Sequence, residues 1–143
     1  MSILEEPIKD VLNVKNYVDG DWVDSGGERK DVVNPATGKT IATVPVSTTK
    51  ELSRAVEAAR DAFPLWREVP PLARARCMFR LKELLEENFE ELSRIQTMEH
   101  GKTIDESRGE TRRGIENVEV AAGIPSLMMG DYLEDIAAGI DEY

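Results

Sequence analysis

Two adjacent arginines, Arg112 and Arg113, are the side chains of this sequence best suited to binding an anion. They lie in the stretch GETRRGIENVEVAAGIP, where glycine interrupts an otherwise helical pattern. Glycine in a helix interior costs about 1 kcal/mol relative to alanine, and the close approach of another group to the backbone is one reason for its presence. A guanidinium is a planar fork of hydrogen-bond donors that matches a carboxylate. The stretch therefore has two interpretations, an anion site or a solvated helix face.

Helical geometry allows at most one of the two arginines to face any one cleft, because successive residues point about 100° apart. Glu110 and Glu116 both lie within ion-pairing reach along the helix. Spacing alone therefore favours the solvated face, and the neighbouring glycines change that balance only modestly.

The two residues that most often carry catalysis lack the partners it requires. Cys77 falls in RARCMF, in mid-helix beside bulky apolar residues, so a position in a core or interface is predicted for it. His100 is the only histidine and stands at a predicted helix end, which favours a capping role. Neither a metal site nor a Ser-His-Asp set can be assembled around it.

The acidic pairs and the glycine pair also have ordinary explanations. Glu86-Glu87 and Glu90-Glu91 are predicted on a solvated helix face. Gly26-Gly27 is followed by an acid, which disfavours a phosphate, and the sequence has no glycine-rich nucleotide motif. The residues by themselves thus indicate no catalytic residue, no metal ligand set and no cofactor-binding residue.

Composition limits the class of protein. The chain has 143 residues and a formal net charge of −10, and such a surface repels the phosphate backbone of a nucleic acid. With 41% hydrophobic residues it can form a core, and its single cysteine suits a reducing compartment. The start, MSILEEPIKD, carries acids where a targeting peptide carries bases, and no apolar run approaches the ~18 residues of a membrane span. We expect a cytoplasmic protein with no membrane or nucleic-acid partner.

Short strands are predicted at the beginning of the chain. Asp19-Gly20 separates Tyr17-Val18 from Trp22-Val23, and Asp-Gly supplies the positive φ angles of a tight hairpin turn. A second extended pair, formed by Val32-Val33 and residues 40–46, is joined by the turn sequence NPATG.

Helices are predicted next. A capping box at residues 48–51 begins the first helix, which Pro64 is expected to end. Pro70-Pro71 suits the start of a second helix, and Asn88 is expected to break it into two pieces.

The remaining part of the chain combines a helix with an extended segment. Gly101 is placed for a C-terminal cap, and residues 103–106 form another capping box. The helix that follows should end before Pro125, because the residue before a proline is pushed away from the α region. Residues 131–143 are expected to form a loop that runs into an extended piece.

These patterns occur together in a known family. In order and spacing, the segments YVDGDWVDS, VVNPATGKTIATVPVST, AVEAARDAFPLW and EHGKT resemble the N-terminal part of the aldehyde dehydrogenase superfamily. The segment RRGIENVEVAAGIPSLMMGD is similar to the branch of CoA-acylating methylmalonate-semialdehyde dehydrogenases. The resemblance extends from about Asn16 to Tyr143.

The resemblance implies an α/β fold. The chain would be the N-terminal segment of the aldehyde dehydrogenase fold, with its Rossmann-like NAD-binding domain, and would itself be mostly helical with short β-hairpins at the N-terminus. Residues 1–131 would belong to the NAD-binding domain and residues 132–143 to the start of the oligomerisation-sheet segment, with a strand beginning at Tyr143. The rest of the family subunit would be absent.

The family reaction converts a semialdehyde, CoA and NAD into acyl-CoA, CO2 and NADH through a cysteine nucleophile. That cysteine and the dinucleotide-binding elements lie downstream in the family, and Cys77 does not match the nucleophile. The resemblance therefore implies NAD and CoA as cofactors of the complete enzyme, with none expected to bind this chain alone. The implied partners are the remainder of the subunit or homologous subunits, in an oligomer.

One role carries over to a single residue. The arginine directly before Gly-Ile-Glu in this branch resembles the one that binds the substrate carboxylate, and that position is Arg113. Discriminating a semialdehyde acid from a plain aldehyde requires a cation that is left unpaired when the carboxylate is missing. Arg112 has no such match and keeps the interpretation of a solvated face.

Three functions follow as hypotheses. The first is an N-terminal fragment of an NAD-dependent CoA-acylating (methyl)malonate-semialdehyde dehydrogenase, inactive alone. The second is a non-catalytic module that packs on a complete dehydrogenase subunit. The third is part of a hydrolytic aldehyde dehydrogenase.

Overall fold

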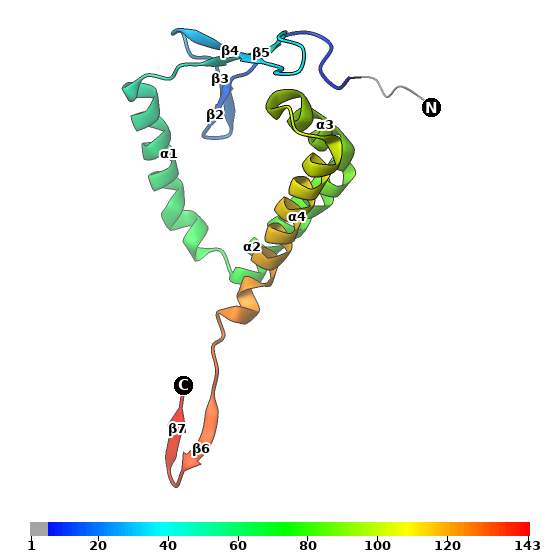
Figure 1. Ribbon diagram of the computed structural model, residues 1–143. Helices are drawn as coiled ribbons and strands as arrows, with labels where there is room; N and C mark the ends of the chain where they lie inside the picture. Colours follow the sequence, from blue (N-terminus) through cyan, green and yellow to red (C-terminus); the bar gives the residue numbers. More distant parts are fainter. Residues whose placement is uncertain (1–5) are drawn as a thin grey trace.

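The computed structural model describes residues 6–143, so the first five residues of the predicted 1–131 segment lie outside it. Within these residues, short strands gather at one end, long helices run away from them, and a hairpin projects beyond the helices (Figure 1). The mixture of helices and short hairpins agrees with the α/β class predicted from the sequence.

The first predicted hairpin is confirmed. Strands β2 (Asn16–Val18) and β3 (Asp21–Val23) pair in antiparallel fashion. The turn residues Asp19 and Gly20 both have positive φ, 54° and 85°, as a tight hairpin turn requires. Tyr17 and Trp22 lie opposite each other with their ring centroids 5.0 Å apart, a cross-strand pair that stabilises the hairpin.

A three-stranded sheet lies beside this hairpin. Its central strand, β5 (Thr40–Pro45), pairs antiparallel with β4 (Arg29–Val33) and parallel with β1 (Leu12–Asn13). The predicted NPATG turn joins β4 to β5. There the Asn34 side chain accepts a hydrogen bond from the backbone N of Ala36 at 2.9 Å, and the backbone N of Gly38 donates to the Asn34 carbonyl at 2.8 Å.

Helix α1 (Thr49–Glu68) begins at the predicted capping box but passes through Pro64, so the prediction that Pro64 ends it is wrong. A single proline removes one main-chain bond and disfavours the helix without forbidding it. The helix ends where the next proline follows, because Val69, directly before Pro70, adopts an extended conformation with ψ 126°. None of the residues of α1 is buried, and in Figure 1 the helix stands apart from the other three.

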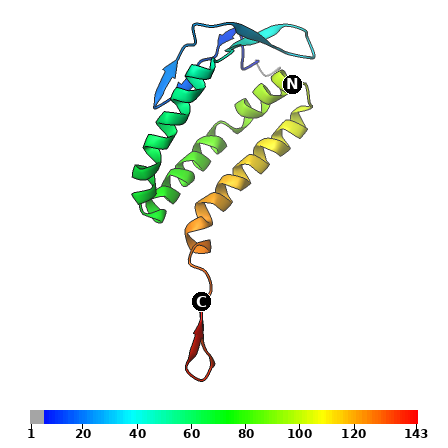
Figure 2. The ribbon, with the colours of Figure 1, turned by 90° about the vertical axis from the view of Figure 1, so that its left-hand side faces the viewer.

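Helices α2 (Pro71–Glu87), α3 (Phe89–His100) and α4 (Ile104–Leu127) form a bundle in which α4 packs against both α2 and α3 (Figure 2). The predicted break at Asn88 and the predicted capping box at Thr103 are both present. Ile115 on α4 is 1% exposed and lies at the centre of the small core. Within the described part of the chain, no helix combines the length and apolar character that crossing a membrane requires.

Gly101 ends α3 as predicted, and it also connects the bundle to the sheet. Its φ of 84° is the left-handed conformation of a helix C-cap. A Cβ at this position would come within 2.6 Å of the Cγ of Pro35 in the β4–β5 turn. Glycine therefore satisfies a backbone requirement and a packing requirement at one position.

The C-terminal segment differs from its prediction in two ways. Helix α4 passes through Pro125 and ends at Leu127, again because one proline does not forbid a helix. Strands β6 (Leu133–Ala137) and β7 (Ile140–Glu142) then form an antiparallel hairpin, so strands already precede Tyr143, where the first was expected to begin. The turn between β6 and β7 contains Gly139 at φ 76°, and the prediction overlooked this glycine as an indication of a turn.

Candidate functional site

The two arginines of α4 point in different directions, as the helical rotation between neighbours requires. The face of α4 that packs on the bundle carries the buried residues Ser107, Ile115 and Ala122. Arg112 reaches from the edge of that face to α2, whereas Arg113 lies farther round the helix. The two adjacent arginines therefore have separate surroundings and do not face the same cleft.

Arg112 forms an ion pair between helices. Its Nη1 donates to Oε1 of Glu86 at 2.6 Å and its Nη2 to Oε2 at 3.0 Å, the bidentate fork that a guanidinium makes with a carboxylate. Its guanidinium carbon also lies 4.9 Å from the ring centroid of Phe89. The hydrogen bond from Arg112 lowers the pKa of the Glu86 carboxyl and raises the pKa of the guanidinium. Arg112 thus binds α4 to α2, and the predicted partners Glu110 and Glu116 are not the ones it uses.

Arg113 is exposed, and among residues 6–143 no carboxylate forms an ion pair with it. Positions 120 and 127 follow at seven-residue intervals, so they lie within about 40° of the direction of Arg113 around the helix. Val120 is 65% exposed and Leu127 is 72% exposed. Val120 and Leu127 therefore form an exposed apolar stripe that begins about two turns beyond Arg113 on the same side of α4.

The acid three residues before Arg113 is held elsewhere. Both oxygens of Glu110 are occupied, Oε1 by Nζ of Lys102 and Oε2 by Nε2 of Gln96 on α3. The Lys102 side chain is only 15% exposed, so this ion pair is partly withdrawn from solvent. The hydrogen bond from Lys102 is the largest cause of the lowered pKa of the Glu110 carboxyl. Glu110 is therefore turned toward α3 and away from Arg113.

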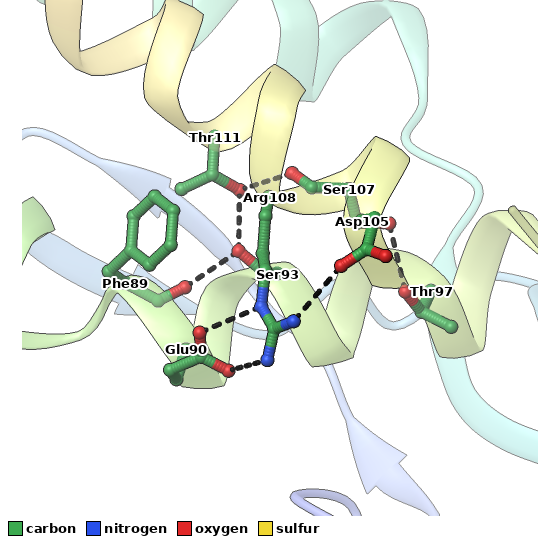
Figure 3. A network of polar contacts seen from close by, with 8 residues as sticks. All are labelled: Phe89, Glu90, Ser93, Thr97, Asp105, Ser107, Arg108 and Thr111. Atoms are coloured by element: carbon green, nitrogen blue, oxygen red, sulfur yellow. Dashed lines mark hydrogen bonds and ion pairs between the residues drawn. The ribbon is translucent and has the colours of Figure 1, made fainter. Parts of the chain in front are cut away.

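A polar seam, defined as the hydroxyls of Ser93, Thr97, Ser107 and Thr111, joins α3 to α4 (Figure 3). Oγ1 of Thr97 lies 2.8 Å from Oγ of Ser107, and Oγ of Ser93 lies 3.1 Å from Oγ1 of Thr111. Ser93 and Ser107 are fully buried. Small hydroxyl side chains let the two helices approach closely while each buried oxygen keeps a partner.

A second interhelical ion pair lies at the edge of this seam. Nε and Nη2 of Arg108 donate to the two oxygens of Glu90 at 2.8 and 2.9 Å, and its Nη1 donates to Asp105 at 3.1 Å (Figure 3). The bond from Arg108 lowers the pKa of the Glu90 carboxyl. The polar seam and this ion pair together fix how far α4 is shifted along α3. They therefore also fix the position of Arg113 along α4 relative to α3.

The structure places the other candidate residues as follows. Cys77 is exposed on α2, as is Phe79 two residues later, so a core position is wrong for this chain and the predicted alternative, an interface position, stays a prediction. His100 occupies the last turn of α3, as predicted. The prediction that the acidic pairs are simply solvated is wrong for Glu86 and Glu90, since each is the ion-pair partner of an arginine on α4. Sequence spacing could not reveal those partners, which lie 26 and 18 residues away.

The helix N-termini among the described residues are poor places for a pyrophosphate, a group that helix N-termini often bind. Helices α3 and α4 carry acids in their first turns, the capping acid Glu51 occupies the first turn of α1, and α2 begins with prolines. Within residues 6–143, no three potential ligands among His, Cys, Asp and Glu come together. Arg113 is one of the exposed guanidinium groups for which the described residues supply no ion-pair partner.

Comparisons with known proteins show the family of this chain. The model of the aldehyde dehydrogenase family matches residues 22–141. A malonate-semialdehyde dehydrogenase of Oceanobacillus iheyensis is 52% identical over 132 residues, which are 92% of this chain and 27% of that protein. The chain therefore spans about a quarter of the length of this relative.

Solved structures give the same result. The crystal structure of the methylmalonate-semialdehyde dehydrogenase from Oceanimonas doudoroffii is 42% identical and superposes with a TM-score of 0.80 over 92% of this chain and 27% of its own. A structure from Sinorhizobium meliloti 1021, described as a methylmalonate-semialdehyde dehydrogenase complexed with NAD, is 36% identical with a TM-score of 0.80, covering 93% of this chain and 27% of that one.

Proposed function

The chain belongs to the aldehyde dehydrogenase family, and we propose that it is the N-terminal part of an NAD-dependent, CoA-acylating dehydrogenase that acts on malonate or methylmalonate semialdehyde. The reaction takes the semialdehyde, CoA and NAD to acyl-CoA, CO2 and NADH. The relatives named for these two substrates, at 52% and 42% identity, support the choice of substrate class.

The observation that carries the proposal is the position of Arg113. It is exposed, it has no ion-pair partner within the described part of the chain, and an apolar stripe begins about two turns beyond it on the same side of α4. A semialdehyde acid presents a carboxylate at one end and a reacting carbonyl at the other. A guanidinium that binds the first holds the second at a fixed distance, which is the ordinary way in which a remote group orients a reacting centre.

Arg113 also accounts for selectivity. A site built to bind a charged group rejects an analogue that lacks it, because the charge of the site is then left without its partner. An uncharged aldehyde of similar size would lose this interaction, while its carbonyl would still reach the nucleophile. Arg113 is thus the group that separates a semialdehyde acid from a plain aldehyde.

In the proposed enzyme, this chain binds the substrate carboxylate, and the nucleophile belongs to other polypeptide. Cys77 is on the surface of α2, and among the described residues the hydrogen-bond partner of its sulfur is the Ala73 carbonyl, at 3.9 Å, and not a general base. The nucleophile and the cradle for NAD would come from polypeptide outside these residues. We therefore propose that the chain has no dehydrogenase activity by itself, and that it binds neither NAD nor CoA alone.

The proposal is tested with a fusion, in which the full chain is joined to the part of the Oceanobacillus iheyensis relative that follows the matched segment. The fusion is expected to reduce NAD with malonate semialdehyde and CoA, followed by NADH absorbance, and the unfused chain is expected to give no NADH. A folded fusion that oxidises propanal but not malonate semialdehyde would contradict the proposed substrate. Turnover by the unfused chain would contradict the proposed division of labour.

A second function, a non-catalytic module that packs on a dehydrogenase subunit, is favoured by one observation. Helix α1 has no buried residue, and Phe63 and Leu65 are among its exposed apolar side chains. Such a surface is suited to cover by another protein. Binding of the unfused chain to the intact Oceanobacillus iheyensis enzyme, seen as co-elution in size-exclusion chromatography, is the expected result. A sharp monomer peak in the presence of that enzyme would contradict it.

A further inference from the structure

Arg113 has two acids within one helical turn, and its availability depends on where they point. Glu110 precedes it by three residues and Glu116 follows it by three, a spacing at which opposite charges on a helix attract. A carboxylate that paired with Arg113 would compete with an anionic substrate for the same donors. Neither does so in the structure.

Glu110 is restrained by two side chains that do not belong to its own helix. Lys102 lies in the connection between α3 and α4, and Gln96 lies on α3. Each contacts a different oxygen of the Glu110 carboxylate, so the carboxylate is held from both sides. The Lys102 side chain is 15% exposed and that of Glu110 is 49% exposed, so the lysine is ordered by its surroundings while the carboxylate still contacts solvent. The arrangement is a built restraint on one acid.

We propose that Lys102, assisted by Gln96, is a positioning residue for substrate specificity: by holding the Glu110 carboxylate against α3, it keeps the guanidinium of Arg113 free for the carboxylate of the substrate. This inference rests on the proposed function of Arg113. It adds a reason why Glu110, one of the two acids within reach of Arg113 on α4, does not pair with it.

A second acid on α4, Glu119, provides the control for Glu110. On the same helix, Glu119 is paired with Lys82 of α2 at 3.4 Å. Glu119 lies six residues beyond Arg113, outside the reach of a helical ion pair. Neutralising Glu119 therefore changes the charge of α4 as neutralising Glu110 does, but leaves the local competition unchanged.

The experiment measures KM and kcat of the fusion for malonate semialdehyde and for propanal, with NAD and CoA saturating. Lys102→Met releases Glu110, so the KM for malonate semialdehyde should rise about two- to threefold, the size of one helical ion pair. The KM for propanal and both kcat values should stay the same. Adding Glu110→Gln to Lys102→Met should restore the original KM, and adding Glu119→Gln instead should not.

Other results would overturn the inference. Equal restoration by Glu119→Gln would mean that Lys102 acts through overall charge, and equal KM changes for the two aldehydes would mean that it acts on folding. If Lys102→Met does not fold, Gln96→Leu removes the other restraint and should raise the same KM by a smaller factor, again reversed by Glu110→Gln; an unchanged KM would contradict the restraint. Equal KM values of the unmodified fusion and its Arg113→Ala variant for malonate semialdehyde would contradict the proposed function itself.

Discussion

Arg112 and Arg113 differ in role because of what surrounds each one. Arg112 is enclosed by a carboxylate and an aromatic ring of neighbouring elements, so its charge is used within the fold. Arg113 has no such partner within residues 6–143, and the nearest acid before it is held by Lys102. The resemblance to a known family gave the two arginines different roles, of which the role of Arg113 stays a prediction, and it did not reveal the pair of Arg112 with Glu86. Its physical cause is tertiary, and spacing along one helix could not have shown it.

At the residue scale, Gly101→Ala should destabilise the chain strongly. Left-handed backbone costs a residue with a Cβ about 1–2 kcal/mol, and the new Cβ would also collide with Pro35, which lies within 2.6 Å of its position. The free energy of unfolding from urea titration measures the loss. Gly109→Ala is the matched control, because a Cβ there meets nothing within 4 Å, and it should stabilise the helix by up to about 1 kcal/mol. Similar losses in both variants would contradict this assignment of Gly101.

At the scale of the helices, the packing of α4 on the bundle depends on one apolar side chain. Ile115→Ala should lower the free energy of unfolding by about 2–5 kcal/mol, as expected for a buried aliphatic residue. Val120→Ala, on the uncovered face of the same helix, should change it by no more than about 0.5 kcal/mol. The comparison is made by urea unfolding of the two variants, and equal effects would show that α4 is not seated on the bundle as described.

The ion pairs that join the helices predict that the bundle becomes less stable as the pH falls. The pKa of the Glu86, Glu90 and Glu110 carboxyls lies below the ordinary value of 4.5, through hydrogen bonds from Arg112, Arg108 and Lys102. A carboxyl with a lowered folded-state pKa stabilises the fold above its ordinary value, and this contribution is lost as the pH falls through the folded-state value. The midpoint of thermal unfolding should therefore drop as the pH falls below about 4.5.

The control for this pH dependence removes the three carboxylates. A variant with Glu86→Gln, Glu90→Gln and Glu110→Gln should be less stable at neutral pH and should lose less stability over the same acid range. A profile parallel to that of the unmodified chain would mean that other carboxyls are responsible.

The fold could be predicted from the sequence where the signal is local. The two capping boxes, the Asp19-Gly20 turn and the Gly101 cap depend on interactions within four residues, and all are present. Both helix ends placed at Pro64 and Pro125 were wrong, because the rule against proline is a preference that the rest of the helix outweighs. The carboxylates bound by Arg112 and Arg108 lie on other helices, so only the folded structure reveals them.

At the scale of the whole molecule, the uncovered surfaces agree with the partial coverage of its relatives. Helix α1 and the stripe beyond Arg113 expose apolar side chains, and the chain spans 27% of the Oceanobacillus iheyensis relative. In a complete dehydrogenase, cover over these faces would also exclude water from Arg113 and strengthen its interaction with a carboxylate. Under the proposed function, the rest of the subunit would complete the site around Arg113.

The most direct test of the central claim compares the two arginines in the fusion. The quantity measured is kcat/KM for malonate semialdehyde relative to propanal. Arg113→Ala should reduce this ratio by at least about tenfold, since a hydrogen-bonded charge is lost from one substrate only. Arg112→Ala, which weakens the contact between α4 and α2, should affect both aldehydes alike and leave the ratio unchanged. A ratio unchanged by Arg113→Ala would contradict the assignment of this residue to the substrate carboxylate.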